Sequence, residues 1–314
     1  MIYFIAPLMN LSLSETELPN NIFNGKTALL SYFNEIFFVK AGEILCNGLA
    51  SNFCYLIKIE VNEEKHSALC YRLNDELYSQ YTLALWLIKD NAIYNSLGFL
   101  FNSENNGMLM DQRAGLISKA DGRYTKTTFT KKEIERGLLL RDQLYDIAID
   151  YTQNNVLHSD GTHNIAPQNF IEYNLQNKIA RSLNFLFNAR SKDFVIEKIS
   201  WYIVAIETLF SFPNNNSDLQ FKLSYLIPKI MGENRPDILS IHDLIKDGYR
   251  ARSNYLHGGK LHNSLKDLNN QIKLSKDLDD LLRKLYLRII EDADLKNVLT
   301  NDKLFESFFK DTLL

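Results

Sequence analysis

The side chains with the clearest chemical potential lie between Lys246 and His262. This stretch holds four basic residues, one acidic residue and two histidines, in a chain whose net charge is -3. An arginine keeps its proton at any ordinary pH, whereas a histidine exchanges one near neutrality. A fixed cation can stabilise negative charge that develops on a phosphate during a reaction. An imidazole can remove or donate the proton that moves in the same reaction.

A helix must present these residues. We expect it over residues 241–257, ending at Gly258-Gly259. Its apolar stripe contains Ile241, Leu244, Ile245, Gly248 and Tyr255. Arg252 falls within that stripe, so it needs a carboxylate, a phosphate or a polar cleft as its partner.

Arg250, Ser253, Asn254 and His257 fall on roughly the opposite face of this helix. Arg252 and His257 are therefore not neighbours on one ideal helix. They can meet only if the helix ends or bends at His257, or if a second copy of the chain supplies the other half of the site.

The spacing from Arg252 to His257 resembles the R-x4-6-H motif of HEPN-domain ribonucleases. The longer segment from Tyr249 to Gly258 resembles the Y-x-x-R-S-x-x-x-H-G form of Apea-like HEPN proteins. Upstream, Ala205-Ile206-Glu207-Thr208-Leu209 is similar to the helix that precedes this motif, with Glu207 in the acidic position. The resemblance covers residues 131–292, and the front half more loosely.

The resemblance implies metal-independent RNA cleavage by a homodimer whose two motifs line one cleft, leaving 2',3'-cyclic phosphate ends. His257 would be the general base or acid, and Arg252 would stabilise the phosphate. Ser253 and Asn254 would hold the phosphate or orient His257, although Ser253 departs from the Asn, Asp or His of several ribonuclease members. Glu207 would hold Arg252, with Tyr249 and Arg250 in support. We expect an antiphage or toxin-like role, with a phage-derived trigger acting on the N-terminal domain.

Structural interpretations of the same residues remain open. Arg252 and Glu207 can form a salt bridge inside a helical bundle, because structural ion pairs imitate active sites. His257 can bond the last carbonyls of its helix, and Tyr249 can be a packing residue. The alternative function is therefore a catalytically inactive HEPN module that dimerises or binds nucleotide or RNA.

The fold class that we expect is α+β, with an N-terminal mixed α/β domain at residues 1–130 and an all-α HEPN bundle at residues 131–314. Thr130-Lys131-Lys132-Glu133 has the pattern of a capping box and marks the boundary. Before it we expect strands at 37–39 and 54–61, a helix at 75–89, and a hairpin over 114–130 that turns at Asp121-Gly122. After it we expect helices at 131–154, 167–190, 193–211, 218–231, 241–257 and 265–291, and a short tail helix.

Other motifs favour no further chemistry. Asn24-Gly25-Lys26-Thr27 resembles the end of a phosphate-binding loop, but Asn20 stands where that loop needs its first glycine. His158, Asp160 and His163 share one segment without a further ligand at metal-binding spacing. We expect no metal and no cofactor.

Composition limits the protein class. Hydrophobic residues make up 46% of the chain and charged residues 23%, as in folded globular proteins. The longest apolar runs fall far short of a membrane span, and the net charge excludes an extended nucleic-acid surface. Three cysteines without paired spacing suit a reducing compartment, so we expect a cytoplasmic protein.

Overall fold

The computed structural model describes residues 1–15, 17–59, 66–113, 115–152, 177–211 and 218–313. Two compact units emerge from it. The first contains Met1–Ile117 and Tyr124–Asp142, and the second contains Ser118–Arg123 and the helices from residue 178 onward. The expected mixture of helices and β-sheet is confirmed. The division at residue 130 stays a prediction, because helix α6 (Lys131–Thr152) has residues in both units.

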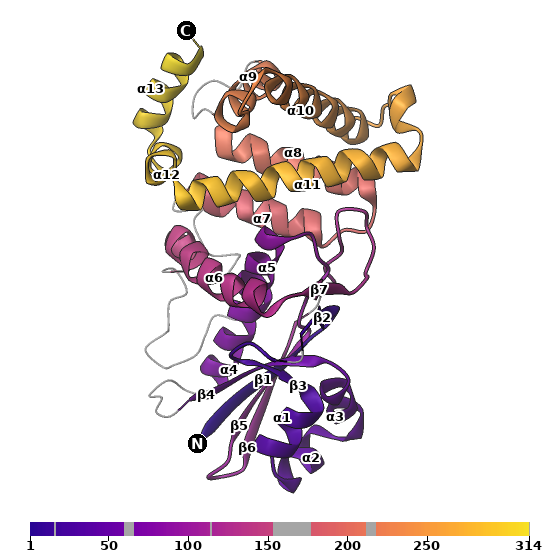
Figure 1. The fold of residues 1–314 in the computed structure, drawn as a ribbon, viewed down its shortest axis with the longest axis vertical. Coiled ribbons are helices and arrows are strands. Elements are labelled where there is room, and N and C mark those ends of the chain that lie inside the picture. The colour runs from indigo at the N-terminus through magenta and orange to yellow at the C-terminus, as the bar shows by residue number, and fades with distance from the viewer. Residues whose placement is uncertain (16, 60–65, 114, 153–176, 212–217, 314) are drawn as a thin grey trace. The chain divides into compact units, whose positions relative to one another are not determined.

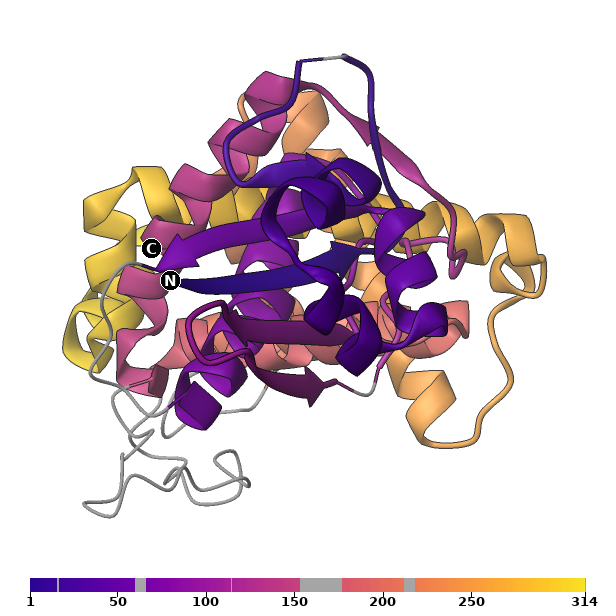
Figure 2. The same cartoon turned by 90° about the horizontal axis from the view of Figure 1, so that it is seen from below.

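An antiparallel sheet forms the centre of the first unit. Within the described residues its five strands lie in the order β3-β4-β1-β5-β6. They are β1 (Ile2–Leu8), β3 (Ile22–Asn24), β4 (Phe53–Ile59), β5 (Leu97–Asn102) and β6 (Gly107–Gln112). Strand β1, which carries the N-terminus, lies in the middle of the sheet (Figure 2). Its Ile5 lies opposite Leu56 of β4 and Phe99 of β5. The apolar N-terminal segment is thus a buried strand.

Helices cover both faces of this sheet (Figure 1). On one face, α1 (Gly25–Tyr32), α2 (Glu35–Ala41) and α3 (Glu43–Ala50) pack around a core with Phe37 and Phe99. The other face carries α4 (His66–Asp75), a π-helical turn (Glu76–Tyr81), α5 (Thr82–Ile88) and the start of α6. The helix expected at residues 75–89 corresponds to the π-helical turn and α5.

The predicted strand at residues 37–39 is wrong, because these residues lie within α2. The Asn34 side chain accepts a hydrogen bond from the backbone N–H of Phe37 at 3.1 Å and so caps this helix. Phe37 is fully buried, with its ring centroid 4.3 Å from that of Phe33. Burial of an aromatic side chain has overridden the local preference for a strand.

The predicted hairpin over residues 114–130 is also wrong, although its turn is present. Gly122 has a φ of 79° and its N–H donates to the carbonyl of Lys119 at 2.8 Å. The strand after this turn, β7 (Thr127–Phe129), pairs in parallel with the distant β2 (Leu11–Leu13). Local turn chemistry was read correctly, but the pairing partner lies more than a hundred residues away in the chain.

The described part of the second unit is helical. Its main helices are α7 (Lys178–Arg190), α8 (Val195–Phe210), α9 (Leu219–Met231), α10 (Arg235–Leu256) and α11 (Leu268–Glu291). The expected tail helix is two helices, α12 (Ala293–Thr300) and α13 (Asp302–Leu313). Of the helix expected at residues 167–190, the part before residue 177 lies outside the described residues.

Capping explains where most of these helices begin. The capping box is present: Glu133 N–H donates to Thr130 Oγ1 at 3.2 Å, and Thr130 N–H donates to Glu133 Oε2 at 2.8 Å. Helix α10 begins six residues before the expected Ile241, because Asn234 accepts a hydrogen bond from Asp237 N–H at 3.1 Å. The prediction missed this cap.

A buried lysine explains why residues 118–123 belong to the second unit. Lys198 of α8 is fully buried, and its ammonium donates to Ser118 Oγ at 2.8 Å. It also donates to the carbonyls of Ala189 and Lys192, at 2.9 and 2.8 Å. A buried cation is tolerated only where such acceptors surround it, so this ammonium fastens the segment to α7 and α8.

All three cysteines are free thiols. Burial raises the pKa of Cys54 to about 12 and that of Cys70 to about 11, so neither thiol is a ready nucleophile. Among the described residues, no helix combines the length and the apolar character needed to cross a lipid bilayer.

Gly25 has a packing role that accounts for the Gly-Lys-Thr sequence. A Cβ atom at Gly25 would lie 1.8 Å from the carbonyl oxygen of Leu49. The Gly25 N–H already donates to the Asn52 carbonyl at 3.0 Å, and Asn24 caps Lys26 N–H at 3.1 Å. The backbone N–H groups of Gly25 and Lys26 are therefore both engaged within the protein.

We therefore predict that Gly25→Ala lowers the free energy of unfolding by at least about 2 kcal/mol, since backbone would have to move. Gly48→Ala is the matched control in α3, where a Cβ meets nothing within 4 Å. It should be neutral or stabilise by about 0.5–1 kcal/mol. Urea unfolding of both variants measures this, and equal losses would contradict the packing argument.

Candidate functional site

The candidate site lies where α10 ends. Gly258 adopts a φ of 68°, and the N–H of Gly259 donates to the Asn254 carbonyl at 2.8 Å. Gly258 N–H donates to the Tyr255 carbonyl at 3.3 Å, which completes a Schellman motif. His257 is the C-cap residue, and its side chain is exposed. The helix thus ends where the sequence predicted.

Close packing of α10 on α8 positions Arg252. A Cβ at Gly248 would lie 2.7 Å from Cδ1 of Ile203, so a larger residue would require that side chain to shift. On the same two helices, Arg252 Nη2 lies 3.3 Å from Glu207 Oε2. The expected contact between these two residues is therefore present.

Burial dominates the electrostatics of this pair. The side chain of Glu207 is 12% exposed and that of Arg252 is 24% exposed. Burial raises the pKa of the Glu207 carboxyl above its ordinary value, and the positive charge of Arg252 partly opposes that rise. Buried Glu207 Oε1 and Arg252 Nε have no hydrogen-bond partner among the described residues, so the pair is incompletely satisfied.

Tyr249 completes the cluster. Its ring centroid lies 5.7 Å from Arg252 Cζ. Burial and the Glu207 carboxylate raise the pKa of the Tyr249 hydroxyl, while the charge and hydrogen bond of Arg252 lower it. The structure therefore brings Glu207, Tyr249 and Arg252 together.

The other predicted residues lie apart from this cluster. Arg250 Nη1 is 3.6 Å from Asp247 Oδ1 in an exposed pair. Ser253 and Asn254 accept the capping N–H groups with their carbonyls, and their side chains are partly exposed. Among the described residues, no hydrogen bond or ion pair joins Arg252 to His257. Both can nevertheless be approached from solvent.

Sequence reasoning missed an aromatic neighbour of this helix end. Phe194, at the N-cap of α8, is 57% exposed, and its ring centroid lies 6.3 Å from that of Tyr255. Leu256 is exposed beside them in sequence. The sequence did contain one signal: Phe194 occupies the N-cap of a helix, where Ser, Thr, Asp or Asn is usual.

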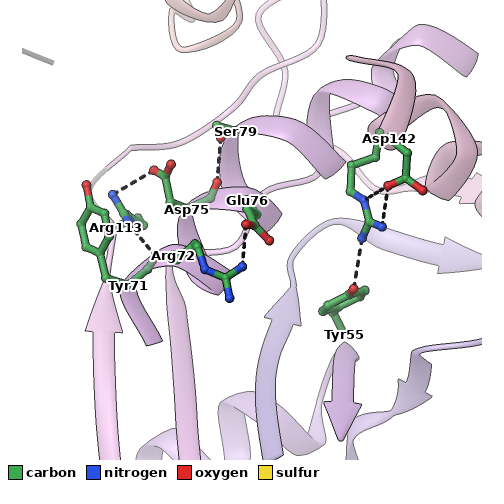
Figure 3. A network of polar contacts seen from close by, with 9 residues as sticks. Tyr55, Tyr71, Arg72, Asp75, Glu76, Ser79, Arg113 and Asp142 are labelled. Carbon is green, nitrogen blue, oxygen red and sulfur yellow. Dashed lines mark hydrogen bonds and ion pairs between the residues drawn. The ribbon is translucent and has the colours of Figure 1, made fainter. Parts of the chain in front are cut away.

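The first unit carries a separate polar cluster, drawn in Figure 3. Arg113 lies 3.1 Å from Asp75 and 3.0 Å from Asp111, and its guanidinium covers the ring of Tyr71. Burial raises the pKa of the Asp75 carboxyl, and the Arg113 charge opposes the rise. These contacts join the last residue of α4, Asp75, to β6 and to Arg113, which directly follows that strand.

A second group of contacts, also drawn in Figure 3, joins β4 to α6. Arg141 donates to the Tyr55 hydroxyl at 3.3 Å and to the Asp142 carboxylate at 2.7 Å. Arg72 and Glu76 form an exposed pair at 2.8 Å. Because each of these guanidinium groups already has a carboxylate partner, we interpret the cluster as structural.

The structure offers no metal centre in the regions it describes, where no three His, Cys, Asp or Glu side chains are grouped suitably. His158, Asp160 and His163 lie outside the described residues.

Comparison of the chain with protein-family models, curated proteins and solved structures found no match. The function must therefore be argued from the site itself.

We predict that Arg252→Met lowers the free energy of unfolding by about 2 kcal/mol near neutral pH, because it leaves a buried carboxylate without its cation. The matched control, Arg250→Met, removes an exposed pair and should change it by less than about 0.5 kcal/mol. Urea unfolding gives both values.

The loss in Arg252→Met should also depend on pH. The folded-state pKa of Glu207 is already raised, so the folded state binds more protons and stability falls as pH rises from the ordinary carboxyl value through the raised one. Without Arg252 that pKa rises further. The destabilisation should be larger at about pH 7 than at about pH 4.5; a loss independent of pH would contradict the assignment.

Proposed function

We propose that this protein is a metal-independent endoribonuclease of the HEPN type, whose second unit is a HEPN helical bundle. One observation carries the proposal: Glu207 of α8 holds Arg252 in the last turns of α10, and an exposed His257 caps the same helix. The resemblance of the segment from Tyr249 to Gly258 to Apea-like HEPN proteins gives this arrangement its interpretation.

The chemistry follows from the residue types. His257 would remove the proton of a ribose 2'-hydroxyl, and the 2'-oxygen would attack phosphorus while the bond to the 5'-oxygen breaks. A proton from solvent on that oxygen gives a 5'-hydroxyl and a 2',3'-cyclic phosphate. Arg252 would stabilise the added negative charge on the phosphate. Ser253 and Asn254 would bind the phosphate or orient the imidazole.

We propose that the working enzyme is a homodimer. Arg252 and His257 are five positions apart, which is about 140° around an ideal helix, so one helix does not bring them together. Two copies that meet at the ends of α10 would place an arginine from one chain beside a histidine from the other. The exposed Phe194 and Leu256 near this end suit such a contact.

The biological setting is proposed on the resemblance alone. It is RNA degradation in the cytoplasm as an antiphage or toxin-like response, with the first unit sensing a phage-derived trigger. The alternative is a catalytically inactive HEPN module that dimerises or binds nucleotide or RNA. One observation favours it: Glu207 already neutralises Arg252, as a purely structural pair would.

We predict that His257→Ala reduces RNA cleavage by about 100- to 10,000-fold, which is the range for loss of a general acid or base. His242→Ala is the matched control, since His242 lies on the same helix and bonds Asp243 at 3.0 Å. It should cleave like the parent protein. Cleavage of a labelled RNA by both variants measures this, and products should carry cyclic phosphate ends.

Chelator should leave this cleavage unchanged, because no step uses a metal. Undiminished cleavage by His257→Ala in a clean preparation would refute the assignment of catalysis to this site.

A mixing experiment tests the shared cleft. Arg252→Ala and His257→Ala should each be inactive alone, whereas random mixing makes half of the dimers heterodimers, each with one intact composite site. About a quarter of the parent activity should return. Sedimentation velocity must show dimers in the same samples. No recovery in verified heterodimers would mean that each site is built from a single chain.

A further inference from the structure

Helix α9 presents a column of exposed side chains that its packing does not explain. Phe221 is 63% exposed and Tyr225 is 42% exposed. Their rings stack with centroids 6.0 Å apart and an interplanar angle of 19°. Lys229 Nζ lies 4.8 Å from the Tyr225 ring centroid. The three residues are spaced four apart, so they form one line along the helix.

The rest of α9 is well anchored. Leu223, Leu226 and Ile227 are almost fully buried on the opposite side. The column is therefore a rigid surface feature, and its aromatic rings are held in place without being needed for the core.

The charge of α9 differs from that of the whole chain. Leu219–Met231 contains Lys222 and Lys229 and no Asp or Glu, in a protein of net charge -3. The nearest carboxylate in sequence is that of Asp218, just before the helix. Aromatic planes interleaved with lysines suit a polyanion that carries flat, stackable groups.

We propose that the exposed ring of Phe221 stacks an unpaired nucleobase of single-stranded RNA, with Lys222 and Lys229 near its phosphates. This inference rests on the proposed function and adds a substrate-binding residue outside the Arg252–His257 site. Lys229 covers the far end of the column at Tyr225, so the ring of Phe221 is the end at which the stack can grow.

The column lies within reach of the proposed cleavage site. Helices α9 and α10 are joined by three residues and pack side by side (Figure 1). At a rise of about 1.5 Å per residue, Phe221 lies roughly 15 Å from the start of this connection and Arg252 roughly 26 Å from its end. Measured along the helix axes alone, the two positions are therefore separated by roughly 10 Å, a length that a short oligonucleotide spans.

The test measures binding of a labelled ten-nucleotide single-stranded RNA to the full chain by fluorescence anisotropy. His257→Ala serves as the background, so that the RNA stays intact. Adding Phe221→Ala should weaken binding by about 5- to 150-fold, which corresponds to about 1–3 kcal/mol for one stacked base. Phe221→Trp should bind within about twofold of the background protein, because it keeps an aromatic face. Leu268→Ala, at a residue that is 59% exposed on α11, is the matched control and should not change binding.

A second readout separates binding from cleavage. With His257 intact, Phe221→Ala should raise KM and leave kcat within about twofold, because it removes binding that is equal in the ground and transition states. If His257→Ala still cleaves but Phe221→Ala weakens binding, the catalytic assignment of His257 fails and the stacking site stands.

If Phe221→Ala binds the RNA as tightly as the background protein, or if the background protein does not bind the RNA, the stacking site is overturned. The proposed ribonuclease activity is then tested by the cleavage assays alone. A change from dimer to monomer on Phe221→Ala would assign this face to a second copy of the chain and overturn the inference as well.

Discussion

The second unit is organised around a carboxylate that lies on the most buried helix. Glu207 has apolar neighbours along α8, and a charge in such surroundings is costly unless a cation meets it. Arg252 supplies that cation from α10, where Gly248 packs closely against Ile203 of α8. The packing of α10 on α8 therefore positions the arginine of the candidate site.

The end of α10 adds the second half of the arrangement. The Schellman motif satisfies the last carbonyl groups with backbone N–H groups, so the His257 side chain is not needed for capping and remains exposed. A partly buried, paired guanidinium and an exposed imidazole thus lie within one and a half turns of each other. This division explains why a structural ion pair and a proton-transfer group can coexist in one short segment.

The misread elements share a physical origin. Phe37 belongs to a helix because the core on one face of the sheet accepts its ring, and β7 pairs with β2 because distant backbone groups satisfy one another. Neither outcome can be predicted from a few neighbouring residues, because residues with a high strand preference pack equally well when they lie on a short capped helix. The Lys198 ammonium is a further example, because its acceptors come from two segments that are about seventy residues apart in the chain.

The sequence alone determined the features that depend on neighbours within one helical turn. These are the capping box at Thr130, the end of α10 at His257 and the need of Arg252 for a partner. The identity of that partner as Glu207 came from a family resemblance, and only the packing of α8 against α10 brought the two side chains together. Tertiary structure also decided the stacked column on α9 and the pairing of β2 with β7. Contacts between distant segments form only when the intervening chain folds and brings them together, and the spacing of neighbouring residues does not encode that event.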